Sequence, residues 1–354
     1  MNYRGVVGVP RLIFATIPAM KSESRESGRG RPSRREVLAT LDEEVALLHR
    51  SLGGLPRAVE ADSILREIWI DDVHNSTAIE GNTMTRAQVA DLVDRRRASA
   101  SIVEVLEVEG YARAADWVYR EAPEAQGVSV ATLSQIHRLA LGPIWEVDPP
   151  ATRDRPGTWR ESGVALRGVR VALPSAIPGD LDSWAASTLD RADQHPVTHS
   201  AVHHAWFERI HPFTDGNGRV GRLLLNYMLI QEGYPPAVIL RAQRNGYLSA
   251  LRRADGGAPD ALTEVIARAV RNALSRFLIP KLAGEVKLVP LSALESQGFY
   301  SADYLRQLAI SGRLRAVREG RLWLSSKSWV EDYIRTRDPR GGPVPRRSTG
   351  RQRR

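Results

Sequence analysis

The chain of 354 residues contains no cysteine. This absence excludes disulfide bonds, zinc sites built on thiolates and a cysteine nucleophile. It is compatible with a reducing cytoplasm, where we expect the protein to be. No run of about 18 apolar residues occurs, so the sequence predicts no membrane span. The pattern GxxxxGK followed by Ser or Thr is also missing, which excludes a P-loop.

Lysine is scarce, with four lysines (Lys21, Lys281, Lys287 and Lys327) among 50 basic residues. The net charge of +9 is concentrated at the two ends of the chain, and the remainder is slightly acidic. We therefore predict that residues 1–35 and 336–354 form basic, disordered arms. Prolines interrupt the apolar stretch before Met20, which argues against a signal peptide and leaves Met20 as an alternative start.

Apolar residues recur at helical spacing through most of the chain up to about residue 285. We expect N-terminal helices in residues 36–120 and a second helical domain in 121–285. One helix of that domain should follow Ser129 or Thr132 and end at Gly142. Residues 164–171 alternate around an Arg-Gly pair and predict a short β-hairpin. The predicted fold class is mainly α.

The stretch HPFTDGNGRVGR, residues 211–222, joins two of these helical patterns. The sequence Gly216-Asn217-Gly218 allows the backbone N–H groups at the start of the second helix to face a ligand closely. Such a concavity, at the positive end of a helix dipole, binds phosphate. Arg219 and Arg222 share one helix face and can contact further phosphate oxygens.

Two residues beside this concavity add chemistry. Asp215 offers a hard oxygen ligand for a phosphate-bound Mg²⁺. His211 precedes the helix, where an imidazole can take a proton from an attacking hydroxyl. Asp-Gly and Asn-Gly are also ordinary turn signals, but all of these residues together favour a nucleotide-phosphate site with a base beside it.

Residues 211–222 match the HxFx(D/E)GNGRxxR signature of Fic proteins at every specified position. The chain resembles this family from roughly residue 40 to residue 280. Pro156–Arg160 and the hairpin at 164–171 resemble the flap that holds a target segment beside the active site. Residues 233–251 resemble the segment that follows the motif helix.

The resemblance implies a Fic-type helical bundle that transfers AMP from ATP to a Ser, Thr or Tyr hydroxyl of a protein. It implies His211 as the base and Asp215 as the Mg²⁺ ligand. The phosphate-binding residues that it implies are Gly216, Asn217, Gly218, Arg219 and, for the γ-phosphate, Arg222. Phe213 would anchor the loop in the core. Tyr247 matches a residue near the adenine, with simple packing as an equal alternative.

A second motif, STAIEGN, matches the family's inhibitory pattern through Ser76, Glu80 and Gly81. A glutamate that reaches Arg222 would form a bidentate ion pair in the place of the γ-phosphate. Bound ATP would then be held in a pose unsuited to transfer. The alternative is an ordinary helix end, since Glu-Gly-Asn often terminates helices.

The last segment, 286–335, predicts two helices, a β-hairpin and a third helix. It resembles excisionase-type and MerR-like winged helix-turn-helix domains, which implies DNA as a partner through residues 286–354. The candidate groove- or phosphate-facing residues are Tyr304, Arg306, Gln307, Arg313, Arg315 and Arg318. Residues 286–334 hold seven basic and five acidic residues, so a docking or dimer module is the alternative.

Two other functions stay open at this stage. The site resembles those of relatives that remove AMP, with Glu80 aligning a water. The chain also fits a DNA-binding regulator that modifies itself. A homodimer is compatible with the sequence, which names neither the target protein, nor the DNA site, nor what relieves the inhibition.

Overall fold

The protein is represented by a computed structural model, which describes residues 33–52, 64–147, 149, 154–165, 171–191, 194–274, 288–291, 294, 300–319 and 322–336. Nearly all of the two predicted basic arms lies outside these residues. So do residues 166–170, the centre of the predicted hairpin. The described residues that flank them, 163–165 and 171–173, are not in strands, and the hairpin stays a prediction.

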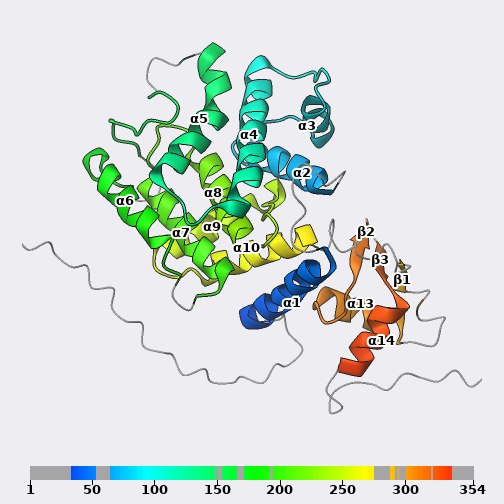
Figure 1. Ribbon diagram of the computed structural model, residues 1–354. Coiled ribbons are helices and arrows are strands. Elements are labelled where there is room, and N and C mark those ends of the chain that lie inside the picture. The colour runs from blue at the N-terminus through cyan, green and yellow to red at the C-terminus, as the bar shows by residue number, and fades with distance from the viewer. Residues whose placement is uncertain are drawn as a thin grey trace, which may run out of the picture. The chain divides into compact units, whose positions relative to one another are not determined.

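The fold is mainly α, as predicted (Figure 1). The helices before residue 275 are α1 (Arg34–Leu52), α2 (Ile64–Ile79), α3 (Arg86–Val93), α4 (Ile102–Glu121), α5 (Val130–Val147), α6 (Ile177–Ser187), α7 (Pro196–Ile210), α8 (Asn217–Gln231), α9 (Arg244–Asp255) and α10 (Asp260–Ala273). Short 3₁₀ helices are η1 (Ala122–Glu124), η2 (Pro174–Ala176) and η3 (Arg241–Gln243). Among the described residues, no helix is both long and apolar enough to cross a membrane.

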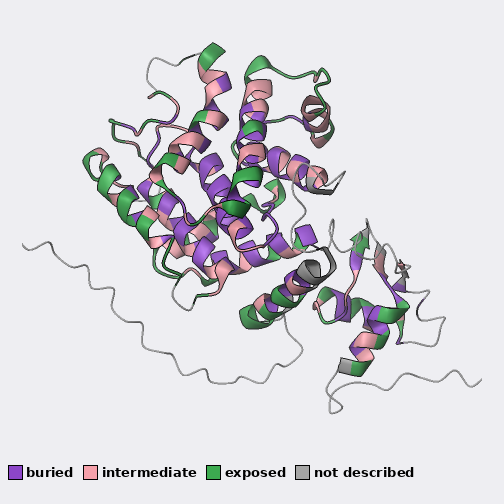
Figure 2. Cartoon of the chain, in the orientation of Figure 1, coloured by how far each residue is buried: buried purple, intermediate pink, exposed green. Residues whose placement is uncertain are grey.

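Helix α8 lies at the centre of this bundle, and Figure 2 shows it buried along most of its length. Its side chains enter two core clusters. Val220, Leu223 and Leu224 pack with α2, α4, α5 and α7, whereas Leu225 and Leu229 pack with α1, α9 and α10. Because apolar burial on several sides stabilises α8, the residues at its N-terminus are held in a fixed position.

Helices α4 and α5 approach each other closely at Gly110, where an added Cβ would lie 2.1 Å from Ala140 O. The expected end of α5 at Gly142 is wrong, because the helix continues through Pro143 to Val147. Leu141 and Pro143 are both buried, and this packing outweighs the local stop signal.

Capping boxes begin two of the N-terminal helices. Thr85 and Gln88 cap α3, and Ser101 and Glu104 cap α4, with each side chain bound to the other residue's backbone N–H. Segment 85–122 therefore folds as separate helices. Glu104 of the second box also accepts hydrogen bonds from Thr83, which lies in the turn after α2. The N-terminus of α4 is therefore bound to this turn.

The C-terminal segment contains α13 (Ala302–Ile310), α14 (Lys327–Thr336) and the strands β1 (Val289–Pro290), β2 (Val317–Glu319) and β3 (Leu322–Ser325). The strands form an antiparallel sheet in the order β1-β3-β2. Most of the first predicted helix lies outside the described residues, although Leu291 and Leu294 are buried in a small local core. The observed helix, hairpin and helix follow the predicted order.

Candidate active site

The motif at 211–222 forms the expected helix–loop–helix junction. His211 ends α7 in the left-handed region, with φ 51° and ψ 60°. Gly216 precedes α8 in the same region, with φ 81°. The two left-handed residues turn the chain sharply, so the side chain of His211 and the N-terminus of α8 lie in one loop.

His211 has the hydrogen bonding of a base. Its Nδ1 lies 3.2 Å from Glu208 O, and since a carbonyl only accepts, the proton sits on Nδ1 and Nε2 keeps its lone pair. Burial lowers the pKa of the imidazole below its ordinary value of 6.5. The ring is therefore neutral near pH 7, as proton abstraction requires.

The loop is fixed internally by Asn217. Its carboxamide accepts from Phe213 N at 2.9 Å and donates to Phe213 O at 2.7 Å. Phe213 is fully buried and stacks on the ring of His137, with centroids 3.7 Å apart. The side chain of Asn217 is thus bonded to the loop itself, and the groups at this position that are suited to a ligand are those of the backbone.

His137, which the sequence reasoning missed, ties this loop to α5. Its Nδ1 accepts from Gly157 N at 2.7 Å, so its Nε2 donates to Asp215 O at 3.0 Å. Burial lowers the pKa of His137 to about 4, so this arrangement persists in the neutral ring. A histidine within an apolar helix was the one sign of it in the sequence.

Arg160, the last residue of the predicted flap segment Pro156–Arg160, also holds the loop. Its guanidinium donates to His211 O at 2.7 Å, Ser162 O at 2.9 Å and Ala172 O at 2.6 Å. Its backbone N–H donates to Pro212 O at 2.9 Å. Arg160 is 2% exposed. Its hydrogen bonds to the carbonyl groups of His211 and Pro212 therefore fix the backbone that carries the candidate base.

Arg222 is buried in the second turn of α8 and faces the inhibitory motif. Its Nη2 donates to Glu80 Oε1 at 2.8 Å. Ser76 also contacts the guanidinium, with its Oγ 2.7 Å from Nε and its carbonyl O 3.0 Å from Nη2. The expected bidentate pair is therefore wrong in detail, because one carboxylate oxygen of Glu80 makes the contact and Nε, which a side-on carboxylate would use, donates to Ser76.

Gly218 allows Glu80 to approach the N-terminus of α8. A Cβ at Gly218 would lie 2.5 Å from Glu80 Oε1. Burial opposes the ionised form of Glu80, but Arg222 and more distant arginines outweigh it, so the pKa of this carboxyl is lowered. A carboxylate thus lies where the helix dipole and Arg222 both favour an anion.

One known protein family matches the part of the chain that carries this loop. Residues 127–229 match the sequence model of the Fic/DOC family. These residues correspond to a Fic domain.

The chain is similar to proteins named protein adenylyltransferase Fic. It is 32% identical to that of Drosophila willistoni over 291 residues, which are 78% of this chain and 56% of the relative. It is 31% identical to that of Drosophila persimilis over 332 residues, 90% of this chain and 63% of the relative. The chain therefore spans about three fifths of the length of these relatives.

Solved structures establish the Fic fold. Fic-1 from C. elegans aligns with a TM-score of 0.60 at 23% identity, over 70% of this chain and 72% of that one. A Fic domain containing signaling protein from Bacteroides thetaiotaomicron aligns with a TM-score of 0.56 at 22% identity, over 67% and 97%.

Tyr247 on α9, beyond the matched residues, lies in the core. It is 1% exposed, and its hydroxyl lies 2.7 Å from His204 Nε2 on α7. This burial supports the packing alternative, and a place near the adenine stays a prediction.

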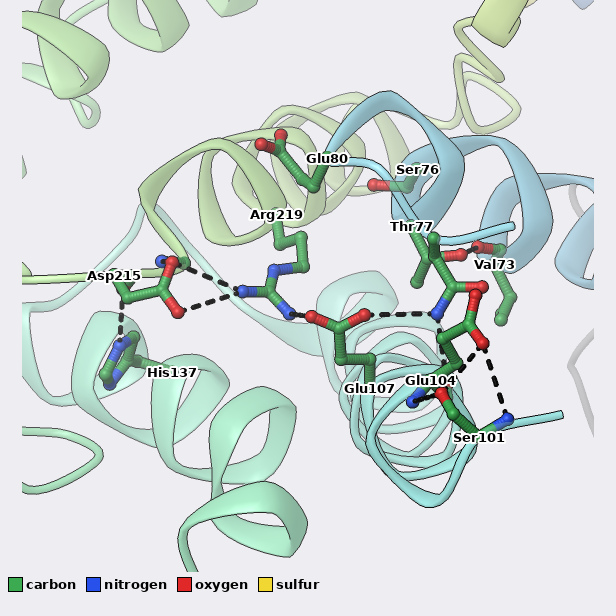
Figure 3. Close-up of polar contacts among 12 residues, drawn as sticks. Val73, Ser76, Thr77, Glu80, Ser101, Glu104, Glu107, His137, Asp215 and Arg219 are labelled. Carbon is green, nitrogen blue, oxygen red and sulfur yellow. Dashed lines mark hydrogen bonds and ion pairs between the residues drawn. The ribbon is translucent and has the colours of Figure 1, made fainter. Parts of the chain in front are cut away.

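Arg219 lies between two carboxylates, one of which the sequence reasoning missed. Its Nη2 lies 3.4 Å from Asp215, and its Nη1 lies 3.5 Å from Glu107 on α4. Figure 3 shows this row from Asp215 through Arg219 to Glu107. Each of the two arginines of the motif thus faces an acidic side chain from a helix that precedes the matched residues 127–229, Glu107 on α4 or Glu80 after α2.

A pocket lies beside the loop, next to Asp215. It is lined by His137, Leu141, Ile144, Trp145, Asp154, Pro156, Thr158, Thr214 and Asp215. The side chain of Asp215 is 37% exposed, so its carboxylate is accessible to a ligand. Within the described residues no three His, Asp or Glu side chains form a metal cluster. A cation at Asp215 would need further oxygens from water or a bound phosphate.

Proposed function

We propose that the protein is an adenylyltransferase that transfers AMP from ATP to a hydroxyl group of a protein. The observation that carries this proposal is a neutral histidine, His211, in one loop with an anion-accepting helix N-terminus and two buried arginines. The names of the Drosophila relatives support the same activity. A cytoplasmic location belongs to the proposal, because ATP is available there.

In the proposed reaction, Nε2 of His211 takes the proton of the target hydroxyl. The hydroxyl oxygen forms a bond to the α-phosphorus, and the bond from that phosphorus to the bridging oxygen breaks, which releases pyrophosphate. The first turn of α8 and Arg222 stabilise the negative charge of the phosphates. Asp215 is suited to hold a Mg²⁺ that retains water and phosphate ligands, and the ion would neutralise phosphate charge.

We further propose that Glu80 inhibits this transfer. Its carboxylate occupies the space over Gly218 and beside Arg222 that the γ-phosphate would take. ATP would therefore bind in a different pose, or more weakly, until Glu80 moves away. Gly81, with φ 114° and no atom within 4 Å of an added Cβ, supplies a turn where such movement is sterically permitted.

The test is intact mass after incubation with ATP and Mg²⁺. The variants are wild type, Glu80→Gly, and Glu80→Gly combined with His211→Ala. An AMP-sized increase in Glu80→Gly alone is the expected result, and loss of the base should lower the rate by about 10²–10⁴. If the chain does not label itself, cell lysate with α-labelled ATP supplies other targets. Absence of transfer there too would contradict the proposal.

A DNA-binding role for residues 286–335 is a second candidate. Arg306 and Gln307 on α13, Arg313 in the loop that follows it and Arg318 on β2 are exposed, which supports the winged-helix interpretation. The division of the chain near residue 285 stays a prediction. Tyr304 instead packs near Tyr300 and Tyr333.

The DNA-binding candidate can be tested on the full chain with a labelled duplex at several salt concentrations. Arg306→Ala combined with Arg313→Ala should weaken binding and reduce the slope against log salt by about 2. Arg113→Ala, an exposed arginine on α4, is the matched control. Equal binding by both variants would favour a docking module.

A further inference from the structure

Glu107 on α4 joins two parts of the site that the proposed function treats separately. One carboxylate oxygen lies 3.5 Å from Nη1 of Arg219 in the motif helix. The other accepts from Asn82 Nδ2 at 3.1 Å. Asn82 lies two residues after Glu80, so a single side chain contacts both the motif and the turn that carries the inhibitory glutamate.

Asn82 fixes that turn on α4. Its Nδ2 also donates to Glu104 O at 3.0 Å, and its Oδ1 accepts from Met84 N at 3.0 Å. The residue is 4% exposed. Thr83 adds a hydrogen bond from its backbone N–H to Glu104 Oε1 at 2.9 Å. The side of the turn that follows Gly81 is therefore held by side chains of Glu104 and Glu107 and by the backbone carbonyl of Glu104, all on α4.

The side of the turn before Gly81 is held by arginines. Arg244 Nε donates to Ile79 O at 2.8 Å, and Arg222 contacts Ser76 and Glu80. Because Gly81 alone separates these two sets of contacts, the position of the Glu80 carboxylate depends on both of them. Loss of the Asn82 contacts would free one end of the turn.

The contact with Arg219 has a second consequence. The side chain of Arg219 is 5% exposed, and its positive charge faces Asp215 and Glu107. A phosphate that approaches the first turn of α8 must compete with Glu107 for this guanidinium, as it must compete with Glu80 for Arg222. Figure 3 shows Glu80 and Glu107 on opposite sides of Arg219.

We propose that Glu107 is a positioning residue of the inhibitory device. One carboxylate oxygen of Glu107 holds Asn82, and Asn82 in turn holds the turn that carries Glu80. The other oxygen of Glu107 contacts Arg219 at the same time. Movement of the Glu80 turn away from Arg222 would therefore break the contact between Asn82 and Glu107. This inference rests on the proposed function, since inhibition presupposes the transfer that Glu80 blocks.

The test is Glu107→Gln, made in the wild-type chain and in Glu80→Gly. Glutamine keeps the size and an acceptor oxygen but removes the charge that faces Arg219. We expect AMP incorporation to rise roughly fivefold in the wild-type background. The rise should be smaller in Glu80→Gly, where the turn no longer carries the inhibitory carboxylate and only the competition for Arg219 is relieved. Glu109→Gln is the matched control, since Glu109 lies on the same helix and pairs with exposed Arg113.

Hydrogen exchange of residues 80–84 gives a readout that needs no activity. Glu107→Gln should speed exchange there, whereas Glu109→Gln should not. If Glu80→Gly fails to transfer AMP, the proposed function fails while the exchange result still decides whether Glu107 holds the turn. An equal loss of transfer in both backgrounds would overturn the inference, because Glu107 would then orient Arg219 for catalysis. Exchange equal to that of the control would also overturn it.

Discussion

The two sides of the site are held by different chemistry. On the side of the base, backbone carbonyls accept hydrogen bonds from buried side chains, at 2.7 Å between Arg160 Nε and His211 O and at 3.0 Å between His137 Nε2 and Asp215 O. On the side of α8, carboxylates face the cations, with 2.8 Å between Glu80 and Arg222.

Under the proposed function, this difference separates the loop of His211, which stays fixed, from the ion pair of Arg222, which a bound phosphate replaces. A backbone carbonyl cannot leave without unfolding the loop, so the bonds of Arg160 and His137 keep the base in one place. A carboxylate and a phosphate offer a guanidinium similar oxygen atoms. The pair between Glu80 and Arg222 can therefore be replaced by a bound phosphate while the fold is unchanged.

The largest expected effect comes from removing the hydrogen bonds that fix the loop on the side of the base. Arg160→Met should lower the free energy of unfolding by about 3 kcal/mol, because buried carbonyls lose their charged donor. In the Glu80→Gly background it should also reduce AMP transfer at least tenfold, roughly the cost of a misplaced base. Urea unfolding and initial rates measure the two effects.

The control for Arg160 is Arg155→Met, since Arg155 directly precedes the segment Pro156–Arg160 and is exposed. It should change neither quantity. Transfer at the full rate by a folded Arg160→Met protein would show that His211 is held by other contacts, and the contrast between the two sides would fail.

On the side of α8, where carboxylates face the arginines, we expect a smaller effect, and there AMP transfer should rise rather than fall. Ser76→Ala removes the acceptor of Arg222 Nε and should weaken the hold on α2. AMP transfer should rise roughly fivefold, while stability falls by about 1 kcal/mol. The serine at position 183, exposed on α6, supplies the control Ser183→Ala. A decrease in transfer would mean that Ser76 orients Arg222 for phosphate rather than for inhibition.

The sequence predicted those parts of the site that lie within motifs. Residues 211–222 carry the base and the helix N-terminus in one continuous stretch. The pair between Glu80 and Arg222 joins residues 142 apart, yet it was predicted because each end lies in a recognisable motif. The end of α5 at Gly142 was mispredicted because tertiary packing decides it.

The supporting residues could not be predicted in the same way. Arg160, His137 and Glu107 reach residues that are 51, 78 and 112 positions away. Two of them bond to backbone carbonyls, which every residue possesses, so the partner leaves no trace in the sequence. Their roles follow only from the fold that brings α4, α5 and the segment before residue 161 around the loop.

The smallest expected effect concerns pH. Burial is the main cause that lowers the pKa of His211 below 6.5, while the charge of Glu80 raises it. A base acts in its neutral form, so transfer by Glu80→Gly should be nearly constant from about pH 8 to about pH 6.5 and fall below that range. Initial rates at constant ionic strength give the midpoint.

Ser76→Ala sharpens this measurement, because it keeps the Glu80 carboxylate that Glu80→Gly removes. The midpoint in Ser76→Ala should therefore lie at a higher pH, by less than about one unit. A midpoint above about pH 7 in Glu80→Gly would mean that His211 becomes exposed when Glu80 is lost. The position of His211 would then depend on the ion pair between Glu80 and Arg222, and the two sides of the site would not be independent.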